Sequence, residues 1–224
     1  MRIIGLIPAR GGSKGIPRKN LQKVNGVPLL AHKIVQAKKS LCNEIWVSTE
    51  DSEIKSLASE FGAGIIDRPE EFSQDTSGSE EVVFHALNFL NLGENDLLIL
   101  LQPTSPLIKV DSINECVSKL LNNPDFASVL TIKESHLHVW STTDNSVWEI
   151  CGPNQSARIR RQDTGTTGWE TGGCYALRVN KLLMQNVILP SPVGIVSVDY
   201  LEALDVDTVS DLQVASDALN FFNV

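Results

Sequence analysis

The sequence of 224 residues has no hydrophobic run long enough to cross a membrane as a helix. Its longest run, residues 97–101, has the length of a strand, far below the roughly 20 residues that a spanning helix needs. The chain also starts directly with a strand pattern and shows no signal-peptide cleavage site. We therefore expect no membrane association and a cytoplasmic location.

Cysteine is scarce, and no two cysteines are spaced as a C-x-x-C pair. The four residues are Cys42, Cys116, Cys151 and Cys174. This scattered pattern favours reduced thiols and supports neither a zinc site nor a disulfide framework.

Acidic residues are absent from the first 43 positions, although the whole chain carries a net charge of −8. The same segment contains nine of the 19 lysines and arginines. An acidic protein is not expected to bind nucleic acid or a membrane surface in general. One cationic segment within it therefore indicates a local anion site.

The known phosphate-loop patterns are also missing from this segment. The P-loop pattern G-x-x-x-x-G-K-[ST] fails at Ile16, and G-x-G-x-x-G does not occur, so the usual kinase and dinucleotide interpretations are not supported. Residues 8–15, PARGGSKG, still combine glycines with Arg10 and Lys14. Successive N–H groups in such a turn can bind an anion, with the two cations beside them. A solvated surface loop is the alternative.

Elsewhere the chain alternates apolar strand patterns with amphipathic helix patterns. Expected strands are 2–7, 44–49, 64–69, 96–103, 126–132, 172–179 and 194–199, and expected helices are 28–37, 52–61, 79–90, 110–121, 181–186 and 208–222. The alternation predicts an α/β fold in one domain, residues 1–224, whose mostly parallel twisted sheet has helices on both faces. Residues 8–28 are expected to be loop. In such sheets ligands bind beyond the carboxyl ends of the strands.

Residues 133–170 break this alternation. Trp140, Trp148 and Trp169 stand there among polar residues, glycine and proline. We expect this segment to leave the main sheet as a small protruding element.

Several blocks together resemble the acylneuraminate cytidylyltransferases, the family of CMP-sialic acid synthetases. They occur in the family's order and span nearly the whole chain: LIPARGGSKGIPRKNLQKVNGVPLL (6–30), WVSTED (46–51), FGAGIIDRP (61–69), QDTSGS (74–79), LLQPTSPL (100–107), RRQD (160–163) and DVDTVSDL (205–212). The resemblance implies a Rossmann-like nucleotidyltransferase fold. The implied reaction is transfer of CMP from CTP to the anomeric hydroxyl of a nonulosonic (sialic-type) 2-keto-3-deoxy sugar acid, with Mg²⁺ and release of pyrophosphate. It also implies a homodimer, for which residues 133–170 are the candidate contact.

The resemblance assigns a triphosphate role to the amino-terminal loop. Arg10, Ser13 and Lys14 would hold the triphosphate of CTP, and Arg10, Lys14 and Arg161 would be catalytic. Charge that builds on the leaving pyrophosphate would be neutralised by the loop cations Arg10 and Lys14. Arg161 would hold the substrate carboxylate or the α-phosphate, with a surface salt bridge as the alternative. The remaining implied nucleotide contacts are Ala9, Gly11, Asn20, Arg68, Asp75 and Ser79. Asn20 and Arg68 also have simpler interpretations, as a loop terminator and an exposed strand end.

The implied sugar contacts are Gln102, Arg161, Thr171 and Tyr175. Gln102 ends the most apolar strand, where an amide is well placed to bond sugar hydroxyls. Thr171 stands where the family has an asparagine that lines the sugar pocket. The sugar is therefore left open among N-acetylneuraminic, legionaminic and ketodeoxynononic acids.

Asp205 and Asp207 follow the last expected strand with one residue between them. In extended chain, positions i and i+2 point to the same side, so the two carboxylates repel unless a cation lies between them. Mg²⁺ prefers oxygen ligands and can be held by two carboxylates together with phosphate oxygens. A helix cap made by Asp207 is the alternative.

Two other functions stay open. One is a related nucleotidyltransferase for a keto-deoxyoctonate or a sugar phosphate, and the latter would need further cations in the sugar half. Candidates for those cations are Lys133, Arg158, Arg160, Arg161 and Arg178. The other is an inactive nucleotide-sugar-binding protein, which would be expected to lose Lys14 or the paired aspartates.

Overall fold

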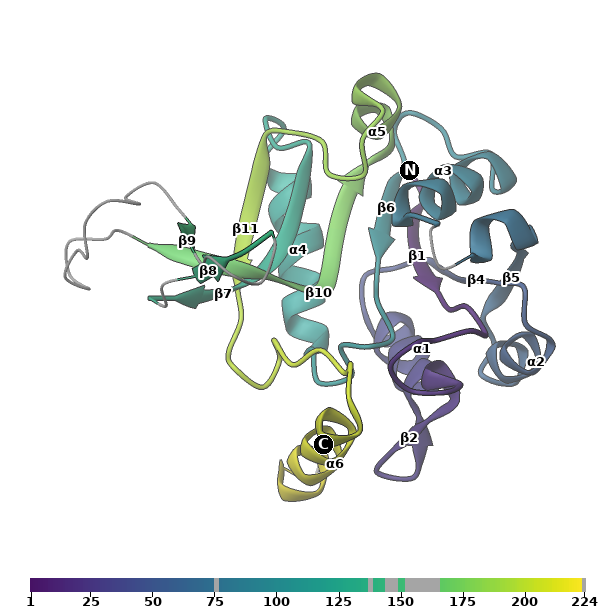
Figure 1. Cartoon of the computed structure of the whole chain (residues 1–224). Coiled ribbons are helices and arrows are strands. Elements are labelled where there is room, and N and C mark those ends of the chain that lie inside the picture. Colours follow the sequence, from purple (N-terminus) through teal and green to yellow (C-terminus); the bar gives the residue numbers. More distant parts are fainter. Residues whose placement is uncertain (75–76, 137–138, 144–148, 152–165, 223–224) are drawn as a thin grey trace.

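The computed structural model describes residues 1–74, 77–136, 139–143, 149–151 and 166–222. Its largest feature is a seven-stranded sheet with the order β11-β7-β10-β6-β1-β4-β5 (Figure 1). Only β10 runs antiparallel to its neighbours within this sheet of described residues, and the other pairs are parallel. The mostly parallel α/β fold is thus confirmed. The strands are β1 (Ile3–Pro8), β4 (Glu44–Thr49), β5 (Gly64–Asp67), β6 (Leu97–Leu100), β7 (Ser128–Ser135), β10 (Thr167–Arg178) and β11 (Val193–Ser197).

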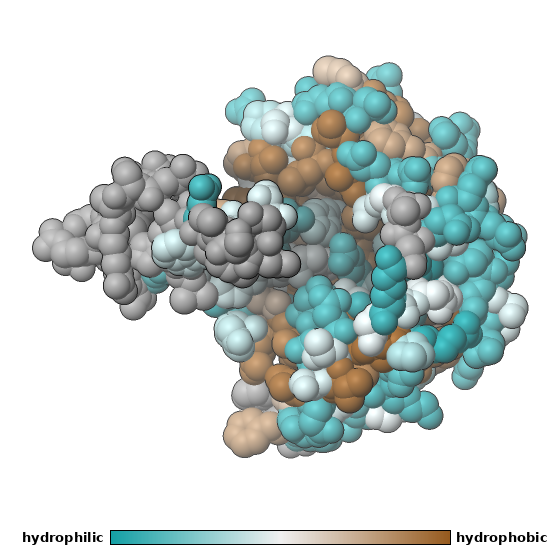
Figure 2. Space-filling view, in the orientation of Figure 1, coloured by the Kyte–Doolittle hydropathy of each residue, from teal (hydrophilic) through white to brown (hydrophobic). Residues whose placement is uncertain are grey.

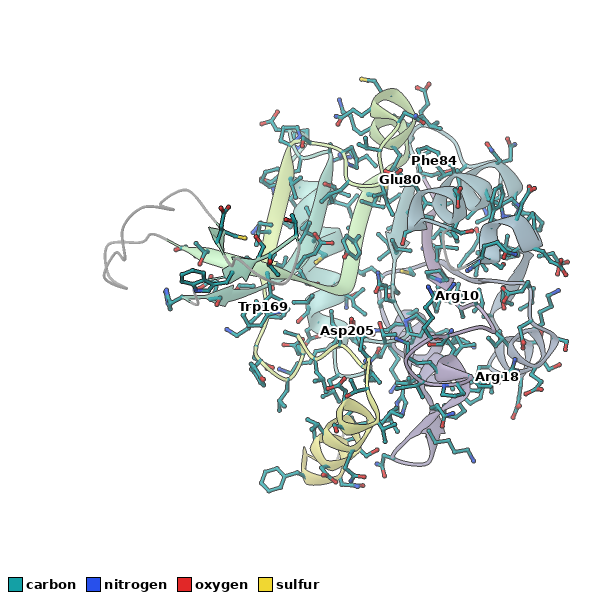
Figure 3. All side chains as sticks on the ribbon, viewed as in Figure 1. Arg10, Arg18, Glu80, Phe84, Trp169 and Asp205 are labelled. Carbon is teal, nitrogen blue, oxygen red and sulfur yellow. The ribbon has the colours of Figure 1, made fainter. Side chains whose placement is uncertain are left out.

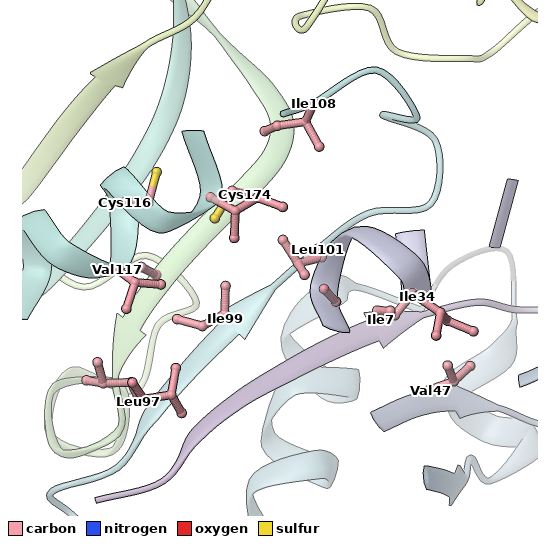
Figure 4. Packing of buried hydrophobic residues seen from close by; sticks show 14 of the residues in the cluster. Ile7, Ile34, Val47, Leu97, Ile99, Leu101, Ile108, Cys116, Val117 and Cys174 are labelled. Atoms are coloured by element: carbon pink, nitrogen blue, oxygen red, sulfur yellow. The ribbon is translucent and has the colours of Figure 1, made fainter. Parts of the chain in front are cut away.

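Helices cover both faces of the sheet, because alternate side chains of each strand point to opposite faces. Ile3 and Ile7 of β1 pack in one apolar cluster with residues of α1 (Leu29–Lys39), α2 (Ser52–Glu60) and α4 (Val110–Asn122), part of which Figure 4 shows. Ile4 and Leu6 pack in a second cluster with α3 (Ser79–Phe89) and α5 (Val179–Gln185). All four residues of β6 are buried, as expected for a central strand. Figure 2 shows hydrophilic side chains over α2 and α3 at the right of this face.

The last helix, α6 (Val209–Phe222), packs beside the amino-terminal segment instead of on the sheet. The expected loop 8–28 contains a short 3-10 helix, η1 (Lys19–Leu21), and a hairpin of β2 (Lys23–Val24) and β3 (Val27–Pro28). The hairpin turns at Asn25 and Gly26, both with positive φ, which is a favoured hairpin turn. A small apolar cluster joins the two ends of the chain; it comprises Ile16, Val24, Leu29, Val206, Ala215 and Leu219.

The region expected to protrude begins as an extension of two sheet strands. Past the last pair with β11, at Ile132, β7 and β10 continue in the same sheet as an antiparallel pair, with Thr167 opposite Ser135. The strands β8 (Val139–Ser141) and β9 (Glu149–Cys151) pair with each other, and the described parts project at the left of Figure 1. Trp140 is 55% exposed and Trp169 is 38% exposed, whereas Trp148 lies outside the described residues. Among the described helices, none has the length and hydropathy to cross a membrane.

The packing of α6 against the amino-terminal hairpin gives a stability prediction. Leu219 of α6 is 8% exposed in the small apolar cluster, whereas Val214 of the same helix is 46% exposed. Leu219→Ala should lower the free energy of unfolding by about 2 kcal/mol or more, because it leaves a cavity. Val214→Ala should change it by no more than about 0.5 kcal/mol. Urea titration measures both, and equal effects would mean that α6 is not held by this cluster.

Candidate functional site

A cleft of about 310 Å³ opens beyond the carboxyl ends of β1 and β6. This is where the topology of an open parallel sheet places ligand sites. Its walls come from the loop after β1, η1, the loop after β5, the start of α3 and the loop after β6. The lining residues are Pro8, Arg10, Gly12, Ser13, Lys19, Asn20, Arg68, Phe72, Gln74, Ser77, Gly78, Ser79, Val82, Gln102, Pro103 and Thr104.

The cleft brings together many of the residues that the sequence singled out. Those lining it are Arg10, Ser13, Asn20, Arg68, Ser79 and Gln102. Lys14 is exposed on the same loop but does not line the cleft, and Ala9 is fully buried with its N–H bonded to the carbonyl of Ser48. Asp75 and Arg161 lie outside the described residues.

Two of these side chains are held by backbone contacts. Asn20 is buried, and its amide donates to the carbonyl of Arg10 at 2.9 Å, which fixes the turn of the loop. Arg68 is also buried, and it donates to the carbonyl of Ser48 at 2.6 Å and to the Ser48 hydroxyl at 3.1 Å. Burial lowers the pKa of the Arg68 guanidinium to about 10, so it stays charged at neutral pH. Arg68 is thus a fixed cation in the cleft wall, not an exposed strand end.

Two carboxylates that follow β4 brace the loop after β1 from outside the cleft. Glu50 accepts the Gly11 N–H at 2.7 Å and the Ser73 hydroxyl at 3.0 Å. Asp51 caps α2 by accepting the Ile54 N–H at 3.0 Å, and it also pairs with Arg18. The hydrogen bond from Arg18 holds the pKa of Asp51 below its usual value.

The opposite end of the chain reaches the same loop. Asp207, whose side chain is 70% exposed, accepts from Lys19 Nζ at 2.9 Å. A Cβ on Gly15 would lie 2.7 Å from the Asp207 carbonyl oxygen, so the two backbones are in close contact. In Figure 3, Arg10 and Asp205 share the central part of the view although they come from opposite ends of the sequence.

Asp205 and Asp207 form an acidic edge beside the cleft. The Val206 N–H donates to the Thr104 carbonyl at 2.8 Å, and the Thr104 side chain lies near the Asp205 carboxyl. Partial desolvation, with Asp207 and Asp211 nearby, raises the pKa of Asp205, while Thr104 and Lys19 oppose this. Within the described residues no group of three or more histidines, cysteines, aspartates or glutamates could hold a metal. A metal here would therefore take further ligands from a substrate or water.

The described bonds do not support the capping alternative for Asp207. Asp211 accepts the N–H groups of Asp207 and Thr208, at 3.0 and 2.7 Å, and the Thr208 hydroxyl accepts the Asp211 N–H at 3.3 Å. Thr208 and Asp211 thus provide hydrogen-bond acceptors for the backbone N–H groups at the start of α6. The Asp207 carboxylate instead pairs with Lys19.

Of the predicted sugar contacts that the structure describes, one lines the cleft and two are buried. Gln102 lines the cleft and approaches β10, since a Cβ on Gly172 would lie 3.0 Å from its Oε1. Tyr175 is buried and donates to Glu170; burial and that bond raise the pKa of the phenol. Thr171 is buried in the sheet, where its hydroxyl bonds that of Thr131 at 2.7 Å, and it does not line the cleft.

Several residues that line the cleft were not predicted from the sequence. Lys19 stood out only as one of many cations, and its pairing with Asp207 depends on a contact between distant segments. Thr104 lies just after β6, so the rule for strand ends could have found it. Phe72 and Gln74 belong to an unpredicted 3-10 helix, η2 (Glu70–Ser73), and its C-cap.

Comparison with known sequences places this chain among nucleotide-transferring proteins. The model of a family described as "Cytidylyltransferase" matches residues 4–187. N-acylneuraminate cytidylyltransferase B of Danio rerio is 36% identical over 76% of this chain and 40% of the relative. CMP-N,N'-diacetyllegionaminic acid synthase of Legionella pneumophila is 30% identical over 94% of this chain and 93% of the relative. The chain spans about half the length, 40% and 50%, of the two Danio rerio relatives that it matches.

Solved structures share the fold. A CMP:2-keto-3-deoxy-manno-octonic acid synthetase, solved with CTP, superposes with a TM-score of 0.71 at 18% identity, over 100% of both chains. The 4-diphosphocytidyl-2C-methyl-D-erythritol synthase of Anaerococcus prevotii superposes with a TM-score of 0.66 at 15% identity, over 98% of both chains. The predicted nucleotidyltransferase fold is thus confirmed.

The contact between Gly15 and Asp207 gives a prediction with a built-in control. Gly15→Ala should lower the free energy of unfolding by about 1–3 kcal/mol, because its Cβ would meet backbone that cannot move aside cheaply. Gly12→Ala should change it by about 0.5 kcal/mol at most, since a Cβ there meets nothing within 4 Å. Thermal unfolding of the two variants checks this. A Gly15→Ala protein as stable as the wild type would contradict the close contact.

The pairing of Asp51 with Arg18 gives a pH prediction. Its folded-state pKa lies below the unfolded value of about 3.9, so the stabilisation is present above about pH 4 and lost as pH falls through the folded pKa. Asp51→Asn, which can still cap α2, should lower stability at pH 7 by about 0.5–1 kcal/mol. Urea unfolding from pH 7 to pH 2 should show the two proteins converging in acid. A difference that stays constant over this range would rule out the charge as its cause.

Proposed function

The chain belongs to the cytidylyltransferase family, and on that basis we propose that its cleft binds CTP and transfers CMP to a sugar acid. The acceptor is the anomeric hydroxyl of a nonulosonic, sialic-type 2-keto-3-deoxy acid, and pyrophosphate is released. The observation that carries this proposal is the meeting of the cationic amino-terminal loop with Asp205 and Asp207 beside one cleft. The names of the relatives, which refer to N-acylneuraminate and N,N'-diacetyllegionaminic acid, support the substrate class.

The triphosphate would bind on the cationic side of the cleft. Arg10 and Arg68 line the cleft. Asn20 holds the loop after β1 through its bond to the Arg10 carbonyl, and this loop also carries Lys14 and Lys19. Phosphate oxygens suit guanidinium groups, which can donate two parallel hydrogen bonds. Because Arg68 is already held by Ser48, it can stabilise charge on the leaving pyrophosphate with little rearrangement. Arg161, which lies outside the described residues, is proposed to act with Arg10 and Lys14.

Asp205 and Asp207 would hold Mg²⁺. Their chemistry fits, because Mg²⁺ is commonly held by one or two carboxylates, with substrate phosphates and water as the other ligands. Like charges also gather at this edge, where partial desolvation and, to a lesser extent, Asp207 and Asp211 raise the pKa of Asp205. When bound, the ion supplies positive charge to the reacting phosphate. Lys19, which already contacts Asp207, would hold the acid pair toward the loop.

The sugar acid would bind between the loop after β6 and β10. Gln102 presents its amide in the cleft, and Gly172 lets β10 approach that amide closely. Tyr175 and Glu170 form a bonded pair near Asp205 and are candidates for the same side of the site. Transfer would then depend mainly on positioning and charge stabilisation.

A homodimer through the projecting arm, a single domain and a cytoplasmic location complete the proposal. Val139, Trp140 and Trp169 are exposed apolar side chains on the described part of the arm. Grouped exposed apolar side chains are typical of interaction sites. Sedimentation equilibrium tests the dimer directly, and a monomer at micromolar concentration would contradict it.

Pyrophosphate release tests the reaction. The protein is supplied with CTP, Mg²⁺ and, in separate reactions, N-acetylneuraminic, legionaminic or ketodeoxynononic acid, a keto-deoxyoctonate or a sugar phosphate. Pyrophosphate release with a nonulosonic acid supports the proposal. Release only with a keto-deoxyoctonate or a sugar phosphate would instead identify the protein as the related nucleotidyltransferase for that substrate. If CTP binds but no pyrophosphate is released with any acceptor, an inactive nucleotide-sugar-binding protein would be favoured.

Replacement of Asp207, one of the two proposed Mg²⁺ ligands, tests the metal site most directly. Asp207→Asn should lower turnover about 100-fold or more. Its melting temperature should stay close to that of the wild type, because the side chain is largely exposed. Asp125→Asn, at another exposed position, serves as the control. Unchanged turnover in Asp207→Asn would remove this residue from the metal site.

A further inference from the structure

Lys33 is a fully buried lysine in the middle of α1, with no exposed surface. Its ammonium donates to the carbonyl oxygen of Ser105 at 2.8 Å. In the part of the chain that the structure describes, no carboxylate pairs with it. Removing an ammonium group from water is costly unless it is paired. Folding alone therefore gives little reason for a lysine at this position.

The partner of Lys33 belongs to the loop that joins β6 to α4, residues 101–109, which we call the β6–α4 loop. Gln36, one turn further along α1, donates to the carbonyl oxygens of Pro106 and Ile108 at 2.7 and 2.9 Å. Two side chains of α1 thus hold three carbonyl groups of this loop. Figure 4 shows the same contact region, where Ile34 of α1 and Leu101 belong to one apolar cluster.

The other side of the β6–α4 loop faces the proposed site. Gln102 and Thr104 line the cleft. The Thr104 carbonyl also accepts the N–H of Val206, which lies between Asp205 and Asp207. Ser105 itself donates to the Thr171 carbonyl at 3.3 Å, next to the turn of β10 that meets Gln102. One short loop therefore links the proposed sugar side to the proposed metal side.

We propose that Lys33 is a positioning residue for the transfer reaction, which acts by holding the β6–α4 loop so that Gln102 and Thr104 keep their places in the cleft. This inference rests on the proposed function. Lys33 itself is too deeply buried to touch a substrate. Its effect reaches the site through the Ser105 carbonyl, which also accepts the Ile108 N–H at 3.5 Å.

The surroundings of Lys33 indicate that its burial is unfavourable for folding. Burial lowers the pKa of its ammonium to about 7. The buried thiol of Cys174 on β10, beside Cys116 and Cys42, opposes this shift only in part. A methionine would fill similar space without this penalty, so the hydrogen bond to the loop is what the lysine adds.

Kinetics of three variants test the inference. Lys33→Met removes the donor and keeps the length of the side chain, and Lys33→Gln keeps an uncharged N–H donor. Lys38→Met removes a cation from the same helix, where Lys38 is exposed and bonds the Phe61 carbonyl away from the cleft. Lys33→Met should lower kcat about tenfold or more, since small displacements of positioning groups are costly. Its KM for CTP should change much less, because the triphosphate side lies on other segments, and its melting temperature should not fall.

Partial recovery of kcat in Lys33→Gln, with Lys38→Met like the wild type, completes the expected result. Normal kcat in a folded Lys33→Met protein would overturn the inference. So would unfolding of both Lys33 variants, since the lysine would then act on stability.

Hydrogen exchange separates this inference from the proposed function. If the wild type transfers no CMP to any acceptor, the proposed function fails. Amide exchange of residues 102–108 still reports whether the loop is held. Faster exchange there in Lys33→Met, and not in Lys38→Met, supports the role of Lys33 in holding the loop. Equal exchange in the wild type and Lys33→Met would overturn that role.

Discussion

The ion pair between Lys19 and Asp207 marks the contact on which the rest of the site depends. It joins residues that are 188 positions apart in the sequence. The close approach of Gly15 to the Asp207 backbone and the apolar cluster shared with α6 support the same contact. Without it, the cations and the acid pair would belong to separate surfaces. With it, opposite charges lie beside one cleft, as the proposed binding of CTP with Mg²⁺ would require.

The second feature of the site is that its charged groups are held by contacts within the protein. Arg68 is fixed by Ser48, and the loop after β1 is fixed by Asn20 within it and by Glu50 from β4. A reaction at phosphorus gains most from groups that are already in place when charge develops. The β6–α4 loop extends this arrangement to the proposed sugar side, because it is bonded to α1 behind it and to the backbone of Val206 beside it.

Much of the sheet could be predicted from the sequence because its strands are short apolar runs with clear ends. β4 has the predicted bounds, and β6 lies inside the predicted run. The antiparallel direction of β10 could not be predicted, since a strand's pattern does not carry its direction. The amino-terminal hairpin was missed although Asn25 and Gly26 are a hairpin signal, because the glycines and cations around them favoured a loop. At the site, the end of β6 indicated Gln102, which lines the cleft, but burial of Thr171 depends on Thr131 from another strand, which no local pattern reveals.

Hydrogen exchange on binding CTP tests the convergence of the two chain ends most directly. Exchange is measured in the protein alone, with CTP and a chelator, and with CTP and Mg²⁺. The account predicts that CTP with Mg²⁺ slows exchange in residues 9–20 and in residues 203–208 together, and that the chelator abolishes the second effect. Slower exchange in the first segment alone, whether or not Mg²⁺ is present, would contradict a single site built from both ends of the chain.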